Sequence, residues 1–179
     1  MPNKILFLLL FLIAAFVIIV AYSYLSNPLE SDDSLIDNCR LKRQDLDQLV
    51  VLLEEDREVS VVTGEFFLLD NGRSSRTGDE GFTTERWNAY KLILDRAGLR
   101  YVIRDPAGSS GFSFGSGALA YSENDGSYFI SKAYFYSMSE PSPIVSSLDD
   151  KGFDTYGTYY RKIEENWYLR FEAGISKPE

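Results

Sequence analysis

Pairs of neighbouring acidic residues are the main acid–base groups in this sequence. They are Asp79 and Glu80, Asp149 and Asp150, and Glu164 and Glu165. A glycoside hydrolase needs two carboxylates that face each other across a cleft, whereas adjacent side chains rarely converge. All three pairs lie in predicted turns, where acids are ordinary solvated residues. We therefore assign no catalytic residue, and a cell-envelope hydrolase that uses a carboxylate pair remains the competing interpretation.

The sequence has no histidine and a single cysteine, Cys39. The absence of histidine removes the usual general base and the commonest metal ligand, so Ser-His-Asp and Cys-His catalysis are excluded. A zinc site would need carboxylates and one thiol, and we expect no metal. An internal disulfide is impossible, and we expect Cys39 to be a half-buried helical thiol without a chemical role.

Two further motifs are compatible with chemistry that needs no histidine. Ser131 and Lys132 contain the groups of a Ser-Lys dyad, but neighbours on a strand face opposite ways. The glycine-rich stretch 108–117 lacks the lysine of a P-loop and the third glycine of a dinucleotide fingerprint, so we interpret it as a turn and a bulged strand. We expect no cofactor and no enzymatic activity.

Tyrosines and a polar loop are the candidates for a binding surface. The tyrosines are Tyr128, Tyr134 and Tyr136, which recur with period two, and Tyr156, Tyr159 and Tyr160 in the next stretch. If these tyrosines are exposed, they form a recognition surface, because tyrosine contributes a large contact area at low entropic cost. If they are buried, they are part of the hydrophobic core. The loop 73–81 has no apolar residue and contains Arg73 and Arg76, which are further candidates.

The segment Ile5–Tyr22 predicts a membrane helix. It contains no charged residue, and fourteen of its eighteen residues are Leu, Ile, Val or Phe. These side chains favour insertion by about 4–8 kcal/mol in total. A helix of this length spans the hydrocarbon core of a bilayer. We therefore expect the membrane as a partner through residues 5–22.

Flanking charge predicts the orientation of this segment. Lys4 precedes it and Glu30 and two aspartates follow it, so residues 1–4 should stay in the cytoplasm. The remainder is expected on the extracytoplasmic side of the cytoplasmic membrane, which is the periplasm in a Gram-negative bacterium. The small residues Ala21 and Ser23 would suit a signal peptidase. Cleavage would give a periplasmic or secreted protein, but the length of the apolar run favours retention.

The net charge restricts the partners of the exported part. The chain carries −9, and because Lys4 is the one charged side chain before Glu30, the part after the membrane segment carries −10. Nucleic-acid binding requires a cluster of basic residues, so we exclude it. Anionic lipid headgroups are disfavoured for the same reason.

Hydrophobic periodicity predicts one α+β domain at 34–174, after a polar linker at 23–33 and before a tail at 175–179. An amphipathic helix is expected over 34–56 and a second between the N-cap Thr83 and the C-terminal Gly98. Strands are expected at 59–69 and 99–103, with hairpins at Asp125–Gly126 and at 164–166. The expected fold is two helices packed on a mainly antiparallel, hairpin-rich sheet.

These features together predict a membrane-tethered extracytoplasmic binding or assembly module without catalytic activity. It would recognise a protein or a cell-envelope component through the aromatic sheet surface or the loop 73–81. Immunity and inhibitor proteins fit the same outline as one subclass. The envelope hydrolase is the alternative from a different functional class.

Overall fold

The computed structural model describes residues 29–70, 72–75, 82–105, 111–115, 120–122, 127–151 and 155–176. The predicted membrane segment 5–22, the Asp125–Gly126 turn and Arg76 lie outside these residues. None of the helices in the described ranges has both the length and the hydropathy that crossing a bilayer requires.

The first predicted helix, over 34–56, is two helices in the structure. Helix α2 (Asp32–Leu41) and helix α3 (Arg43–Glu55) are separated at Lys42. The apolar side of α2 packs on the sheet at β9, whereas that of α3 packs on helix α4 (Thr84–Ala97). The bend at Lys42 lets the apolar side of α2 contact β9 while the apolar side of α3 contacts α4. The described residues thus form three helices where two were expected.

The fold also begins earlier than the expected boundary at residue 34. Ser31 caps α2, because its side chain accepts a hydrogen bond from the backbone N–H of Ser34. Leu29 is buried, and so is Asp32. The last part of the expected linker 23–33 is therefore integrated into the domain.

Helix α4 confirms the prediction made from its caps. The Thr83 side chain accepts a hydrogen bond from the N–H of Arg86, and Gly98 ends the helix in the left-handed conformation with φ of 70°. Phe82 and Trp87 both pack on Phe67, with ring centroids 4.4 and 5.9 Å away. Local sequence therefore suffices for this helix, since both of its ends are specified by nearby residues.

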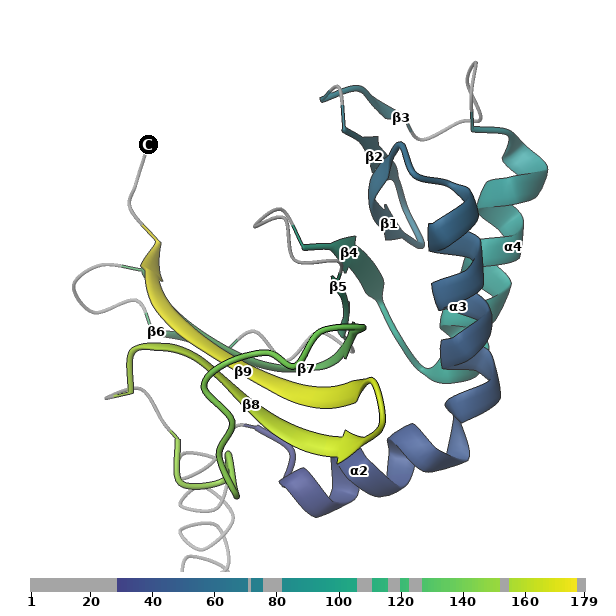
Figure 1. Cartoon of the computed structure of the whole chain (residues 1–179). Coiled ribbons are helices and arrows are strands. Elements are labelled where there is room, and N and C mark those ends of the chain that lie inside the picture. The colour runs from purple at the N-terminus through teal and green to yellow at the C-terminus, as the bar shows by residue number, and fades with distance from the viewer. Residues whose placement is uncertain are drawn as a thin grey trace, which may run out of the picture.

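All nine strands in the described residues belong to one antiparallel sheet, with the order β3-β2-β1-β4-β5-β7-β9-β8 and β6 paired to β7 (Figure 1). The strands are β1 (Val59–Thr63), β2 (Phe67–Leu69), β3 (Ser74–Ser75), β4 (Tyr101–Arg104), β5 (Gly111–Gly115), β6 (Ala120–Ser122), β7 (Ser127–Ser137), β8 (Gly157–Glu164) and β9 (Trp167–Ser176). The predicted α+β class is confirmed.

Two details of strand pairing differ from expectation. The predicted strand 59–69 is the β1–β2 hairpin, because the Thr63 hydroxyl accepts hydrogen bonds from the N–H groups of Glu65 and Phe66 and closes a turn. A two-residue turn at Asp125–Gly126 would place Tyr121 opposite Ile130, but Tyr121 pairs with Phe129, a shift of one residue. Strand β7 pairs with β9 from Ser127 to Tyr136, and this long ladder determines its register more strongly than a turn does.

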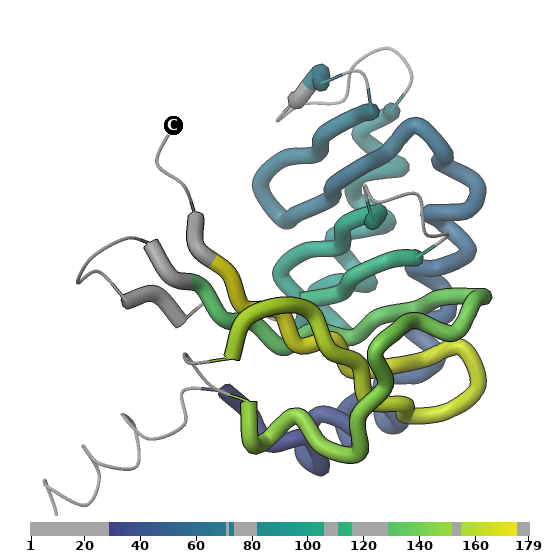
Figure 2. The backbone as a smooth tube through the Cα atoms, turned by 60° about the vertical axis from the view of Figure 1, so that its left-hand side comes forward, coloured from purple at the N-terminus to yellow at the C-terminus, as the bar shows by residue number. Residues whose placement is uncertain are grey.

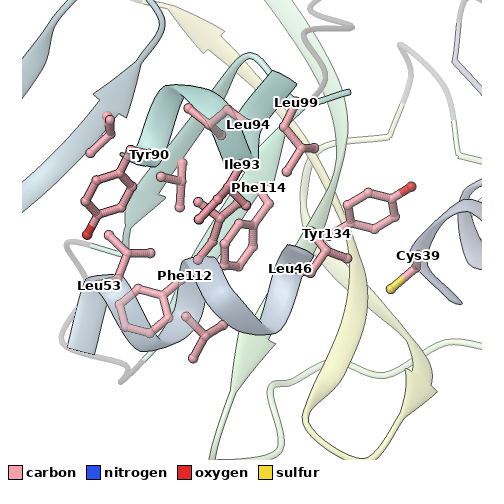
Figure 3. Packing of buried hydrophobic residues seen from close by; sticks show 14 of the residues in the cluster. Cys39, Leu46, Leu53, Tyr90, Ile93, Leu94, Leu99, Phe112, Phe114 and Tyr134 are labelled. Carbon is pink, nitrogen blue, oxygen red and sulfur yellow. The ribbon is translucent and has the colours of Figure 1, made fainter. Parts of the chain in front are cut away.

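The helices cover one face of the curved sheet. In Figure 1, α3 and α4 lie along β1 and β4, and α2 lies below β8 and β9. Phe112 and Phe114 point from β5 into this layer, where they pack among Leu46, Ile93 and Leu94 (Figure 3). The opposite face carries no helix from the described parts of the chain, and we call it the open face.

A long connection between β7 and β8 passes beside the N-terminal end of α2 (Figure 2). It contains Pro143, as expected for a loop. The segment then runs along the outer edge of β8: the N–H of Tyr160 donates to the carbonyl of Pro143 at 3.0 Å, and the N–H of Val145 donates to the carbonyl of Tyr160 at 2.8 Å. Leu148, further along, is fully buried in the core.

Candidate functional site

The open face contains a polar cavity of about 230 Å³ across strands β4, β5, β7 and β9, which we call the Arg170 pocket. It is lined by Tyr101, Ile103, Asp105, Ser113, Ser131, Ala133, Arg170 and Glu172. The register explains this composition, since Ile103 pairs with Ser113, Ala133 with Arg170 and Ser131 with Glu172. Because strand side chains alternate, their neighbours face the helices and build the core.

Arg170 lies between the polar groups of this pocket. Its Nη1 donates a hydrogen bond of 2.9 Å to the Ser113 hydroxyl, and its Nη2 lies 3.0 Å from a Glu172 carboxylate oxygen. The guanidinium also covers the Phe135 ring, with Cζ 5.8 Å from the ring centroid. Its Nε is buried and has no partner, and no other buried side-chain nitrogen or oxygen of the described residues is in this state. An unpaired buried N–H calls for a water or a ligand.

Aromatic rings lie flat against glycines of the neighbouring strands on the same face. A Cβ atom at Gly115 would overlap the Tyr101 ring, and one at Gly111 would overlap Phe135. The expected bulge in the glycine-rich stretch is absent from Gly111–Gly115, where pairing with β4 and β7 is continuous. The glycines make room for these rings, and one of them, Tyr101, lines the Arg170 pocket.

Tyr101 contributes a hydroxyl as well as a ring. Burial raises the pKa of Tyr101, and the charge of Glu172 raises it further, while Arg170 acts in the opposite direction. The phenol therefore stays protonated at neutral pH. A protonated phenol both donates and accepts a hydrogen bond.

The tyrosines predicted as a binding surface lie mainly on the helix-covered side. Tyr134 is buried, and Tyr136 and Tyr159 are half-buried against the core. Tyr156 is exposed, whereas Tyr160 is buried on the open face with Phe135 and Tyr168. The side chain of Tyr128 lies outside the described residues. The sequence showed that these tyrosines recur with period two and therefore share one face of a strand. It did not show which face of the sheet the helices would cover.

The candidate loop 73–81 is described in part. Arg73 is exposed and precedes Ser74–Ser75, which pairs with β2 as a short strand. Arg76 lies outside the described residues. Arg73 does not contribute to the lining of the Arg170 pocket.

A buried ion cluster lies behind the pocket, on the helix side of β7. Lys132 Nζ contacts Asp32 at 2.8 Å, Asp149 at 2.7 Å and the carbonyl of Glu30 at 3.1 Å. Arg161 reaches the other carboxylate oxygen of Asp32, also at 2.8 Å. Asp149 was expected to be a solvated turn residue, and its side chain is indeed 40% exposed in a turn, although it also contacts Lys132, which is 2% exposed.

The acid–base state of this cluster follows from its hydrogen bonds. Burial alone would raise the pKa of Asp32, but hydrogen bonds from the Leu148 N–H, Lys132 and Arg161 outweigh burial and lower it. Asp32 is therefore ionised and paired. The arrangement satisfies its charges internally, which is typical of a structural cluster. Ser131 faces the other side of β7, so the Ser-Lys dyad is not assembled.

Cys39 is fully buried, more deeply than the half-buried position expected from the sequence. Burial raises its pKa to about 12. The reactive form of a cysteine is the thiolate, and this thiol is protonated at neutral pH. Within the described residues, no three side chains of the metal-ligating types gather into a cluster.

A second, more apolar cavity of about 740 Å³ lies between α3 and α4. Leu41 at the end of α2 and Val51 on α3 line it and are 80% and 53% exposed, and Gln44 and Gln48 of α3 line it as well. Exposed apolar side chains at this spacing are typical of a surface that contacts another protein.

Comparisons of the chain with protein-family models, with curated proteins and with solved structures return no match.

Proposed function

We propose that the protein is a non-catalytic binding module, tethered to the cytoplasmic membrane by residues 5–22, which captures a cell-envelope component in the Arg170 pocket on the extracytoplasmic side. The observation that carries the proposal is the cavity itself, in which Arg170 holds the Ser113 hydroxyl and the Glu172 carboxylate in fixed positions. A concave site with a few fixed polar groups is the usual form of a small-molecule binding site.

The architecture of the pocket supports binding. Its polar groups come from four adjacent strands of one sheet, so their positions are set by the ladders and not by a loop. Ser113 is buried and is already oriented by Arg170. Sites of this kind are usually formed before the ligand arrives, which lowers the entropic cost of binding.

The competing hydrolase would place a carboxylate pair in this same pocket. Asp105 and Glu172 both line it, which is the feature that favours this alternative. A glycoside hydrolase, however, needs one of its two carboxyl groups protonated as a general acid. Glu172 is held in an ion pair with Arg170 at 3.0 Å, so its carboxyl group is not presented free to a substrate. Binding without turnover is therefore the better-supported function.

A second candidate function is the binding of a protein, as an immunity or inhibitor protein would do. The cavity between α3 and α4 favours it, because Leu41 and Val51 expose apolar surface at its lining. Replacing Leu41 with aspartate should abolish capture of a protein partner and leave a ligand of the Arg170 pocket unaffected. If Leu41→Asp abolished both the protein interaction and the binding of the pocket ligand, the proposal of two separate binding surfaces would be wrong.

Photo-crosslinking in intact cells tests the principal proposal. A photoreactive residue at Ser131, which lines the pocket, should give adducts with an envelope component, and the additional substitution Arg170→Lys should reduce them strongly. The matched control is a photoreactive residue at Glu54, an exposed position on α3. Equal adducts from both positions, or recovery of the protein alone from position 131, would overturn the proposal.

A further inference from the structure

We infer that the ion cluster around Asp32 is a mechanical clamp, through which tension passes between the membrane tether and the strand that carries the Arg170 pocket. The inference rests on the tethered binding function proposed above, and it adds that the protein bears load between the membrane and the component that it captures. A protein that is anchored at one end and bound to a second body is pulled whenever the two move apart.

Tension from the membrane would enter the domain at the start of helix α2. Leu29 is buried and Ser31 caps the helix, so the fold begins directly after the linker. If packing alone held α2, a pull at this end would peel the helix away from β9 turn by turn. Asp32, the first residue of the helix, is fully buried at this end. The contacts of Asp32 therefore decide where the load goes.

The Asp32 carboxylate is bound by three elements outside α2. One oxygen accepts from Lys132 Nζ at 2.8 Å, and the other accepts from the Leu148 N–H at 2.6 Å and from Arg161 at 2.8 Å. The N–H of Asp32 also donates to the Asp149 carboxylate at 2.8 Å. These partners belong to β7, to β8 and to the connection between them. A pull on Asp32 is therefore passed directly to the sheet.

The clamp meets the sheet where strand β9 is held on both sides. Lys132 of β7 pairs with Phe171, and Arg161 of β8 pairs with Leu169, so the two bases flank the same part of β9. The ladder between β7 and β9 continues from there to Ser176. Load that reaches Lys132 and Arg161 is therefore shared by backbone hydrogen bonds on both sides of β9, and helices α3 and α4 lie outside this path.

The same position in β7 connects the clamp to the pocket. Ser131 and Ala133 line the Arg170 pocket and are the chain neighbours of Lys132. Tension from a captured component would reach Lys132 through these neighbours and leave the domain through Asp32. Because the side chains of Lys132 and Asp32 are both buried, water and salt screen this ion pair little.

Single-molecule force spectroscopy on the full-length protein in lipid nanodiscs tests the clamp. One handle is attached at Asn27→Cys, in the linker, and the other at Glu179→Cys, so that the load enters the domain at Asp32. Lys132→Met should raise the rate of the first rupture at a given force by about 100-fold or more. That rupture should release residues 29–41, which lengthens the chain by about 40 Å.

A second pulling direction separates a clamp from a general contribution to stability. With Glu54→Cys in place of Asn27→Cys, the load enters through α3, and the cluster stays intact while the first contacts break. Interactions that are still present in the transition state do not change the rate of unfolding. Lys132→Met should therefore leave the rate of the first rupture nearly unchanged in this direction.

Two further variants support the comparison. Arg161→Gln removes one contact of Asp32 and retains the Lys132 pair, so it should give a smaller acceleration that is again confined to the Asn27 direction. It keeps the test decisive if Lys132→Met does not fold. Lys162→Met is the matched control on β8, since its side chain is 51% exposed, and it should change the rate in neither direction.

The outcomes separate the clamp from the proposed function, because no ligand takes part in these measurements. Equal acceleration in both directions, or no acceleration in the Asn27 direction, overturns the clamp. Adducts at Ser131 in the photo-crosslinking experiment would then still support the binding function. A directional effect without adducts at Ser131 supports the clamp at the tether and overturns capture in the pocket.

Discussion

Lys132 and Asp32, one hundred positions apart in the sequence, form a 2.8 Å ion pair in which the two side chains are 2% and 0% exposed. Lys132 lies on β7 between Ser131 and Ala133, which face the opposite side and line the Arg170 pocket. The pair therefore fixes the start of the domain to the strand that carries the pocket.

Replacing Lys132 with methionine should destabilise the protein by about 3–5 kcal/mol, because removal of one partner leaves Asp32 buried with part of its charge unmatched. Chemical denaturation followed by circular dichroism measures the change. Lys162→Met on β8 is the matched control, since its side chain is 51% exposed, and it should change stability by less than about 0.5 kcal/mol. Similar effects of the two substitutions would contradict a structural role for the cluster.

The same cluster predicts a loss of stability in acid. The pKa of Asp32 is lower in the folded state than its ordinary value of 3.8, so the folded state binds this proton more weakly than the unfolded state does. The stabilisation is fully present above pH 3.8 and is lost as the pH falls through the lower, folded-state pKa. Denaturation curves measured from pH 7 down to pH values well below 3.8 should show this decline at the acid end, and Asp32→Asn should flatten it. An unchanged pH profile in Asp32→Asn would rule out this assignment.

Gly111→Ala should destabilise the protein by about 1–3 kcal/mol, because the new Cβ would overlap the ring of Phe135. This ring is buried against Tyr160 and Arg170 and has little room to move. Thermal unfolding measures the effect. Gly64→Ala is the control: no atom lies within 4 Å of a Cβ there, and its φ is not positive. A tolerated Gly111→Ala would mean that the ring is not held against the glycine.

The membrane segment predicts both where the protein fractionates and which way it faces. The full-length protein should pellet with membranes, and removal of residues 1–22 should release it. A periplasm-dependent reporter such as alkaline phosphatase, fused after Glu179, should be active. Full-length protein that stays in the supernatant, or a reporter that works only in the cytosol, would contradict the tether.

Elements that are specified by neighbouring residues could be predicted from the sequence. Thr83 and Gly98 delimit α4 because a capping hydroxyl and a left-handed glycine act on the adjacent turn. The sequence also alternates Trp167, Leu169 and Phe171 with Tyr168, Arg170 and Glu172, a pattern typical of a half-buried strand, and the first three residues are buried in the core. The bend at Lys42 was missed, because it depends on packing against β9 and α4, which are distant in the sequence.

The candidate site was missed for the same physical reason. The contact between Ser113 and Arg170 spans 57 positions, and each residue by itself is an ordinary polar side chain on a strand. The alternation in β9 did place Arg170 and Glu172 away from the core. Nothing local indicated that β5 would bring a hydroxyl to Arg170, since this depends on the order β5-β7-β9 in the sheet.

The stretch of chain from Pro143 to Val145 has a consequence for crowded membranes. Outermost strands can recruit strands from other molecules, which leads to aggregation. The hydrogen bonds of Tyr160 to Pro143 and Val145 occupy the backbone of β8 at its midpoint, so a foreign strand cannot extend the sheet across that position. If copies are anchored side by side on one bilayer, as proposed above, they collide frequently, and this short cover would prevent them from adhering through β8 at that point.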